Sequence, residues 1–321
     1  MLRVLAVSGG VVLVLGVLTS FCHPWMTLQG AFPGPLHQSV DVEAVEVCTV
    51  EDLELNEASG LAMSLQHKDA VWIHNDSGDT ARLFLVGLDG KTRAVVHLNQ
   101  HKPLDWEDMC SFEIDGQAWL LIGDIGDNSR NRGTTAPPCQ LLLVKEPKSP
   151  LAAGDVDAKT PPMVNVDVHA ILQFSFPDGP ADCESLAVDT ERREILLLTK
   201  TEPANCRLFR LPLSLTAGTT AAQAELLASI PVPYATAMDI SRDGRQLAII
   251  NMFSGAMLNR KPHESWTIAC ANPVKILMLP ARPQGETVCF EPQGKTLLIN
   301  SERARQPLWR ITLPQSDSKS E

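Results

Sequence analysis

The sequence predicts an all-β fold, a five-bladed β-propeller, from three observations. Short apolar runs and turn signals alternate about every ten residues along the chain. A short strand opening with an acidic or hydroxyl side chain recurs five times, at Ser59, Glu107, Glu184, Thr236 and Glu286. The intervals between these residues are 48, 77, 52 and 50, and a period near 50 is typical of propeller blades. No segment has a helical period long enough to compete.

Each repeat divides into strands in chain order. Asp-Gly pairs at 89–90, 115–116 and 243–244 mark tight hairpin turns between strands. The strands expected for the first four blades span residues 58–64, 70–75, 82–87 and 93–98; 109–114, 118–123, 140–145 and 164–174; 185–189, 194–200, 207–211 and 224–230; and 237–241, 246–251, 265–270 and 274–279.

The fifth repeat has only three expected strands, at 287–291, 296–301 and 308–313. Residues 41–50 alternate apolar and polar with period two, so we expect this segment to complete the last blade beside 308–313. That pairing closes the ring and removes exposed strand edges.

A six-bladed propeller is the alternative, because the 77-residue interval is long enough to hide a blade. The excess lies in residues 126–138 and 148–162, which are rich in Asn, Arg, Pro, Asp and Lys. Such composition is typical of loops, so five blades are favoured.

The N-terminus predicts export. Arg3 is the only charged residue before an apolar stretch over 4–21, as in a signal peptide or an uncleaved signal anchor over 1–22. We therefore expect a periplasmic, secreted or surface-anchored protein. The other expected segments are a linker over 23–40, the propeller over 41–314 and a disordered tail over 315–321.

The net charge is −11 and the isoelectric point is near 5.2. This balance argues against nucleic acid as a partner and against an anionic membrane surface. Membrane contact is expected only through an N-terminal anchor. The expected partner is an anionic small molecule or another protein, and the acidic surplus also suits a bound cation.

The recurring residues predict a metal site. Equivalent positions at the start of the innermost strands converge on the propeller axis, so Ser59, Glu107, Glu184, Thr236 and Glu286 would form a ring. Three carboxylates cannot sit together without a large cost unless a cation neutralises them. Hard oxygen donors suit Ca²⁺. The alternative is a hydrogen-bonded polar plug that holds the blades together.

Polar loops follow the second strand of each blade and are expected at the same end as the ring. Their acids, Asp76, Asp79, Asp124 and Asp127, are candidates to activate water or hold a second cation, although Asp and Asn also form ordinary turns. The candidates for substrate contact are His74, Asn75, Asn128, Lys200 and Arg303. No Gly-x-Ser-x-Gly sequence indicates a serine nucleophile.

Several strings resemble those of a family of exported bacterial propellers of largely unknown function. They are Glu57-Ala-Ser-Gly-Leu, His74-Asn-Asp-Ser-Gly-Asp, Asp105-Trp-Glu-Asp, Gly123-Asp-Ile-Gly-Asp-Asn, Glu184-Ser-Leu-Ala-Val-Asp and Thr199-Lys. The ring more distantly resembles that of the calcium-activated apyrases. Those are five-bladed propellers whose central Ca²⁺ is held by Ser and Glu, and Thr236 stands where that family has Ser.

Two functions remain open. In the first, the protein is a Ca²⁺-dependent hydrolase of a phosphate ester or other anionic small molecule. In the second, it is a non-catalytic binding or scaffold propeller in which the same cation is structural.

Overall fold

The computed structural model describes residues 38–148, 161–200 and 206–314, which belong to one compact unit. The predicted signal segment, most of the predicted linker and the predicted tail lie outside these ranges. Among the described residues, no helix has the length and apolar character needed to cross a membrane.

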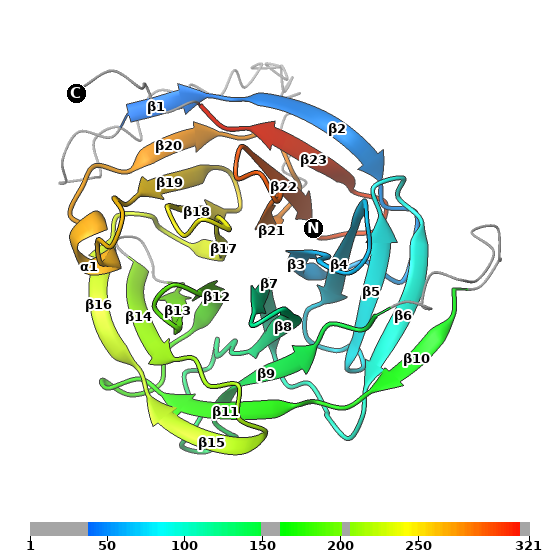
Figure 1. Ribbon diagram of the computed structural model, residues 1–321, viewed down its shortest axis with the longest axis horizontal. Helices are drawn as coiled ribbons and strands as arrows, with labels where there is room; N and C mark the ends of the chain where they lie inside the picture. The colour runs from blue at the N-terminus through cyan, green and yellow to red at the C-terminus, as the bar shows by residue number, and fades with distance from the viewer. Residues whose placement is uncertain (1–37, 149–160, 201–205, 315–321) are drawn as a thin grey trace, which may run out of the picture. The chain divides into compact units, whose positions relative to one another are not determined.

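Five small sheets stand in a ring around a common axis, which confirms the five-bladed propeller and rules out the six-bladed alternative (Figure 1). Blade 1 contains β3 (Ala58–Met63), β4 (Ala70–Asn75), β5 (Arg82–Gly87) and β6 (Thr92–Leu98); blade 2 contains β7 (Trp106–Ile114), β8 (Gln117–Asp124), β9 (Cys139–Lys145) and β11 (Ala170–Ser175); blade 3 contains β12 (Cys183–Asp189), β13 (Glu194–Thr199), β14 (Cys206–Pro212) and β16 (Glu225–Ile230); blade 4 contains β17 (Ala235–Ile240), β18 (Gln246–Asn251), β19 (Gly255–Asn259) and β20 (Lys275–Met278); blade 5 contains β21 (Gly285–Phe290), β22 (Thr296–Ser301), β23 (Pro307–Thr312) and β2 (Glu43–Thr49).

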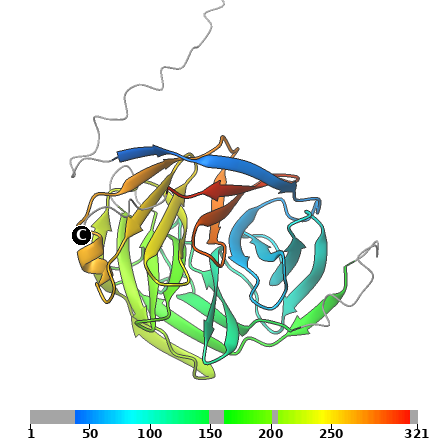
Figure 2. The same ribbon diagram turned by 45° about the horizontal axis from the view of Figure 1, so that its top comes forward.

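The ring closes as the sequence predicts. Strand β2 runs antiparallel to β23, with Ala44 opposite Ile311, so the N-terminal part of the chain completes the C-terminal blade. Innermost strands β3, β7, β12, β17 and β21 contact one another in turn around the axis, and β21 returns to β3 (Figure 2). Closure gives each innermost strand a neighbouring innermost strand on both sides.

Three further strands cross between blades. Strands β1 (Gln38–Asp41), β10 (Met163–Val166) and β15 (Gly218–Gln223) each pair in parallel with the outer strand of one blade. The chain then continues into the outer strand of the next blade, so each crossing ties two blades together. The single strand predicted over 164–174 is therefore wrong, and β1 begins inside the predicted linker. A continuous apolar run does not reveal where its pairing partner changes.

The strand predicted over 265–270 is also wrong, because this segment is the short helix α1 (Trp266–Ala269). The side chain of Ser265 accepts a hydrogen bond from the Ile268 amide and so caps the helix. Trp266 and Ala269 are buried on one face, three residues apart, and the Trp266 indole donates to Asp189 over 2.9 Å. Strand β19 is the third strand of blade 4, the position that the sequence predicted for residues 265–270.

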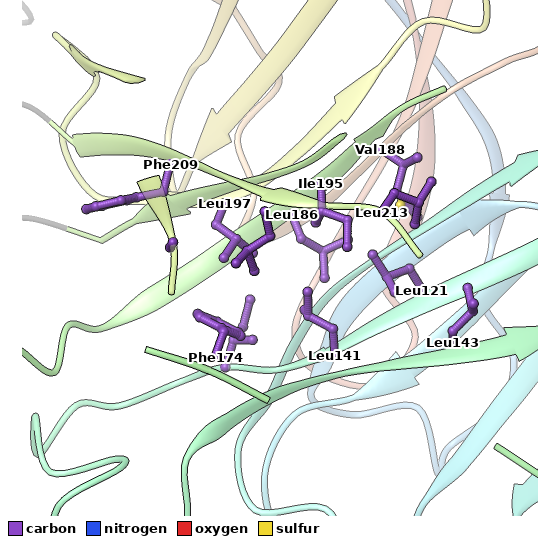
Figure 3. Packing of buried hydrophobic residues seen from close by; sticks show 14 of the residues in the cluster. Leu121, Leu141, Leu143, Phe174, Leu186, Val188, Ile195, Leu197, Phe209 and Leu213 are labelled. Atoms are coloured by element: carbon purple, nitrogen blue, oxygen red, sulfur yellow. The ribbon is translucent and has the colours of Figure 1, made fainter. Parts of the chain in front are cut away.

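The core lies between blades as layers of apolar side chains. Figure 3 shows one such layer, where Leu121 and Leu141 of blade 2 face Leu186, Ile195 and Leu197 of blade 3. Fully burying each such side chain contributes about 2 kcal/mol. The layers fix the blades relative to one another and thereby position the side chains at the axis.

Candidate functional site

The five recurring residues are each the second residue of an innermost strand, and all five are buried. Each lies at a β-bulge, where the pairing with the second strand of the blade shifts by one residue. A bulge leaves one residue unpaired and re-aims its side chain. The bulges therefore explain how an equivalent polar residue in every blade is directed to one end of the axis, which we call the ring end.

Neighbouring blades are linked through these residues. The Ser59 hydroxyl donates to Glu107 Oε2 over 3.3 Å, from blade 1 to blade 2. The Thr236 hydroxyl donates to the Gly285 carbonyl over 2.8 Å, from blade 4 to blade 5. The predicted residues thus lie at the same end of the axis, and the hydroxyls of Ser59 and Thr236 form hydrogen bonds across blade boundaries.

Lys200, predicted as a substrate contact, reaches into this ring from the loop after β13. Its Nζ lies 2.8 Å from Glu184 Oε2. Burial raises the pKa of Glu184 to about 8, whereas Glu184 raises the pKa of Lys200 despite the opposing effect of burial. Burial and the charge of Glu184 place the pKa of Glu107 well above its usual range, and burial raises that of Glu286. One ammonium therefore faces three carboxyl groups.

A second feature brings carboxylates into the range of one cation. Oxygens of Asp76, Asp105 and Glu107 all lie within 4.8 Å of one another. Calcium–oxygen distances of roughly 2.3–2.6 Å place the ligands of one ion at about this separation. Burial, followed by the charge of Asp76, raises the pKa of Asp105 to about 6. The donor set, three hard oxygen ligands, fits Ca²⁺.

More carboxyl groups surround these three. Burial raises the pKa of Asp182, and burial with the charges of Glu286 and Glu57 raises that of Glu302 to about 7. We call the full set the acidic cluster, which contains Asp76, Asp105, Glu107, Asp182, Glu184, Glu286 and Glu302. Burial is the main cause of the raised pKa values throughout the set, and the charges of neighbouring carboxyl groups add to it.

The other loop acids predicted as catalytic have structural partners. Asp79 forms an ion pair with Arg82 at 2.9 Å, and this bond lowers the pKa of Asp79 against the effect of burial. Asp124 is fully buried and lies 3.0 Å from Arg132. Asp127 accepts the amides of Asn131 and Arg132 and so closes its own loop. Of the four, only Asp76 belongs to the acidic cluster.

The remaining predicted substrate contacts differ in environment. His74 is fully buried against Trp106, with ring centroids 5.1 Å apart, and burial lowers its pKa to about 4. Asn75 donates to the Glu54 carbonyl and to Asp79, so its amide is engaged in loop structure. Asn128 and Arg303 are both exposed.

Two residues at the ring end were missed by the sequence reasoning. Asp105 directly precedes Trp106 and Glu107 in the string Asp105-Trp-Glu-Asp, so its position at the ring end could have been predicted from the sequence. Arg282 had no signal in the sequence. Its guanidinium is mostly buried over Gly285, where an added Cβ would lie 2.6 Å from Cζ. Burial lowers its pKa to about 10, and Nε and Nη1 have no hydrogen-bond partner among the described residues.

No protein-family model matches the chain, and no curated protein matches it. Among solved structures, the gluconolactonase XC5397 of Xanthomonas campestris is similar at 11% identity, covering 85% of this chain and 90% of that one with a TM-score of 0.47. The PQQ-bound aldose sugar dehydrogenase of Streptomyces coelicolor shares 10% identity, covering 84% and 98% with a TM-score of 0.47. The Pan2 WD40 domain of Neurospora crassa shares 10%, covering 88% and 99% with a TM-score of 0.43. Similarity this low says nothing about family or activity, so the two resemblances stay predictions.

Proposed function

We propose that this propeller is a Ca²⁺-dependent hydrolase of a small anionic substrate such as a phosphate ester. The observation that supports the proposal is the convergence of Asp76, Asp105 and Glu107 within 4.8 Å at the ring end. These three residues would hold the ion, and Glu184, Glu286 and the hydroxyls of Ser59 and Thr236 would form the wall beneath it.

A bound divalent cation would polarise a phosphoryl or carbonyl oxygen of the substrate. Lys200 and Arg282 supply positive charge that would attract an anionic substrate group to the ring end, where the other charged side chains are mainly acidic. Glu302, with a pKa of about 7, is suited to accept a proton from attacking water near neutral pH. His74 has no role as a base in this proposal, because it is buried beneath the ring.

The alternative is a binding or scaffold propeller with a structural cation. The pairing of Asp79, Asp124 and Asp127 favours it, because these acids stabilise loops and leave fewer groups free for chemistry. In this alternative the ion would raise stability by linkage, and no substrate would turn over.

The test is calorimetric titration of the purified propeller with Ca²⁺ and Mg²⁺, followed by a phosphoester panel in the better-bound metal. We expect Glu107→Gln and Asp76→Asn each to weaken Ca²⁺ binding at least tenfold. The matched control is Glu43→Gln, which removes an exposed carboxylate from outer strand β2 and should change nothing. Metal binding without turnover would support the scaffold alternative. No binding of either metal would overturn both.

A further inference from the structure

A cavity of about 240 Å³ opens at the opposite end of the axis from the ring. Its walls come from the last residues of the innermost strands of all five blades. They include Met63 of β3, Ser111 and Phe112 of β7, Val188 of β12, Asp239 of β17 and Phe290 of β21. Roughly eight water volumes of about 30 Å³ would fill the space, so it can admit a small organic ligand. We call this space the terminal cavity.

The carboxyl group of Asp239 is held in a fixed position in this wall. One oxygen accepts the amide of Ile240 and the other accepts the amide of Phe290, each over 2.8 Å. A carboxylate oxygen can accept a second hydrogen bond, so both keep capacity for a ligand. No basic side chain among the described residues forms an ion pair with Asp239.

The other charged side chains of the terminal cavity have partners. Glu113 lies 3.7 Å from Arg242 at the exposed rim. Glu291 receives two hydrogen bonds from Arg310, at 2.6 and 2.8 Å. Among the described carboxyl groups of the terminal cavity, Asp239 is therefore the one without a charged partner.

The rest of the wall mixes polar and apolar groups. Met63, Val188 and Ile240 lie beside Thr190 and Ser241, and the Phe112 and Phe290 side chains are mostly buried in the layers between blades. The hydroxyl of Ser111 is already used, because it donates to the Met63 carbonyl over 2.6 Å. A ligand that fits this cavity is small and carries one cationic donor group for Asp239.

We propose that the terminal cavity binds a small protonated amine, with its ammonium group on Asp239. The site is separate from the metal site proposed at the ring end, since the two lie at opposite ends of the same strands. It therefore stands or falls independently of the hydrolase proposal.

Calorimetric titration with benzylamine tests the proposal, with benzyl alcohol as a neutral probe of nearly the same shape. We expect saturable binding of benzylamine to the wild-type protein and binding of benzyl alcohol at least tenfold weaker. Asp239→Asn should weaken benzylamine binding at least tenfold. Glu43→Gln, on the outer strand of blade 5, should leave it unchanged, and so should Glu107→Gln at the ring end.

Asp239→Asn leaves one backbone amide less well paired, so its folding is checked by circular dichroism. If it does not fold, Val188→Phe provides the second variant, because its larger ring occupies part of the terminal cavity and should abolish benzylamine binding. Absence of saturable benzylamine binding to the wild type would overturn the proposal. Equal affinity for benzyl alcohol would overturn it too, as would undiminished binding by a folded Asp239→Asn or Val188→Phe variant.

Discussion

The two ends of the propeller axis are formed by the same five strands but have opposite chemistry. At the ring end, a bulge at the second residue of each strand turns a polar side chain toward the axis. At the other end the strands are regular, and polar and apolar side chains together surround a cavity in which Asp239 is the carboxyl group without an ion-pair partner among the described residues. A local change in pairing register thus accompanies the gathering of carboxyl groups at one end of the strands.

The ring end itself shows a second contrast, between paired and unbalanced acids. Asp79 and Asp124 each have an arginine partner, whereas Asp105 and Glu302 lie among other carboxyl groups. Loop composition is the same in both groups, so only their partners separate structural from candidate functional acids. Four measurements test these contrasts, in order of expected effect.

The largest effect is expected for Asp124→Asn. Removing the charge leaves Arg132 buried without its carboxylate and weakens the contacts to the Leu104 and Asp105 amides. Loss of one partner from a buried pair should lower the free energy of unfolding by about 3 kcal/mol in urea denaturation. Asp76→Asn is the control and should cost less than about 1 kcal/mol, because Asp76 forms no ion pair with another described residue. Equal stability of the two variants would remove the distinction between paired and unbalanced acids.

Gly60→Ala should follow, with a loss of about 2 kcal/mol. The added Cβ would lie 2.1 Å from His74 Nε2, and His74 cannot move aside because it is buried against Trp106. Gly255→Ala is the matched control, since its Cβ would meet the Leu279 side chain at 3.2 Å and Leu277 Cβ at 3.4 Å, which are much milder contacts. Both are measured by urea denaturation. A tolerated Gly60→Ala would mean that the bulge in blade 1 adjusts more easily than the packing indicates.

A smaller effect is expected from pH. In the folded protein the pKa values of Glu302 and Asp239 are about 7, above the ordinary value near 4 for carboxyl groups. The folded state therefore holds their protons more tightly, and melting temperature should fall by a few degrees from about pH 6.5 to 8. His74 does not contribute in this window, because its pKa is lowered to about 4 and both states are neutral above its ordinary value.

The two ends can be separated in the same measurement. Glu302→Gln should remove part of the share of the ring end, where Glu184, with a pKa of about 8, also titrates in this window, and Asp239→Asn should remove the share of the terminal cavity. Added Ca²⁺ should reduce only the decline that depends on the ring end. A pH profile unchanged by both variants would contradict the assigned origin of the effect.

The smallest effect is expected at the rim of the terminal cavity. Glu113→Gln breaks an exposed pair with Arg242 at 3.7 Å, so the free energy of unfolding should change by less than about 0.5 kcal/mol. Urea denaturation at low and high salt checks this. A loss above about 1 kcal/mol would show that rim charges contribute more than an exposed pair normally does.

Sequence alone was sufficient for the number of blades and the closing strand, because both follow from periodicity. The recurrence of Ser59, Glu107, Glu184, Thr236 and Glu286 identified the strands that reach the axis and the end at which their polar residues gather. Alternation over 41–50 identified the strand that closes blade 5. Such patterns repeat at every blade, so local errors do not hide them.

Only the tertiary structure decided which partners each residue has. It divided the segment 164–174 between two blades, turned 265–270 into helix α1, and gave Asp79 and Asp124 arginine partners while leaving Asp76 beside Asp105 and Glu107. It also formed the terminal cavity from residues of five distant repeats. The contacts among Asp76, Asp105 and Glu107 depend on neighbouring blades, which no local sequence pattern encodes. The Asp79–Arg82 and Asp124–Arg132 pairs are local in sequence, but the geometry that brings each pair together is set by the folded loop.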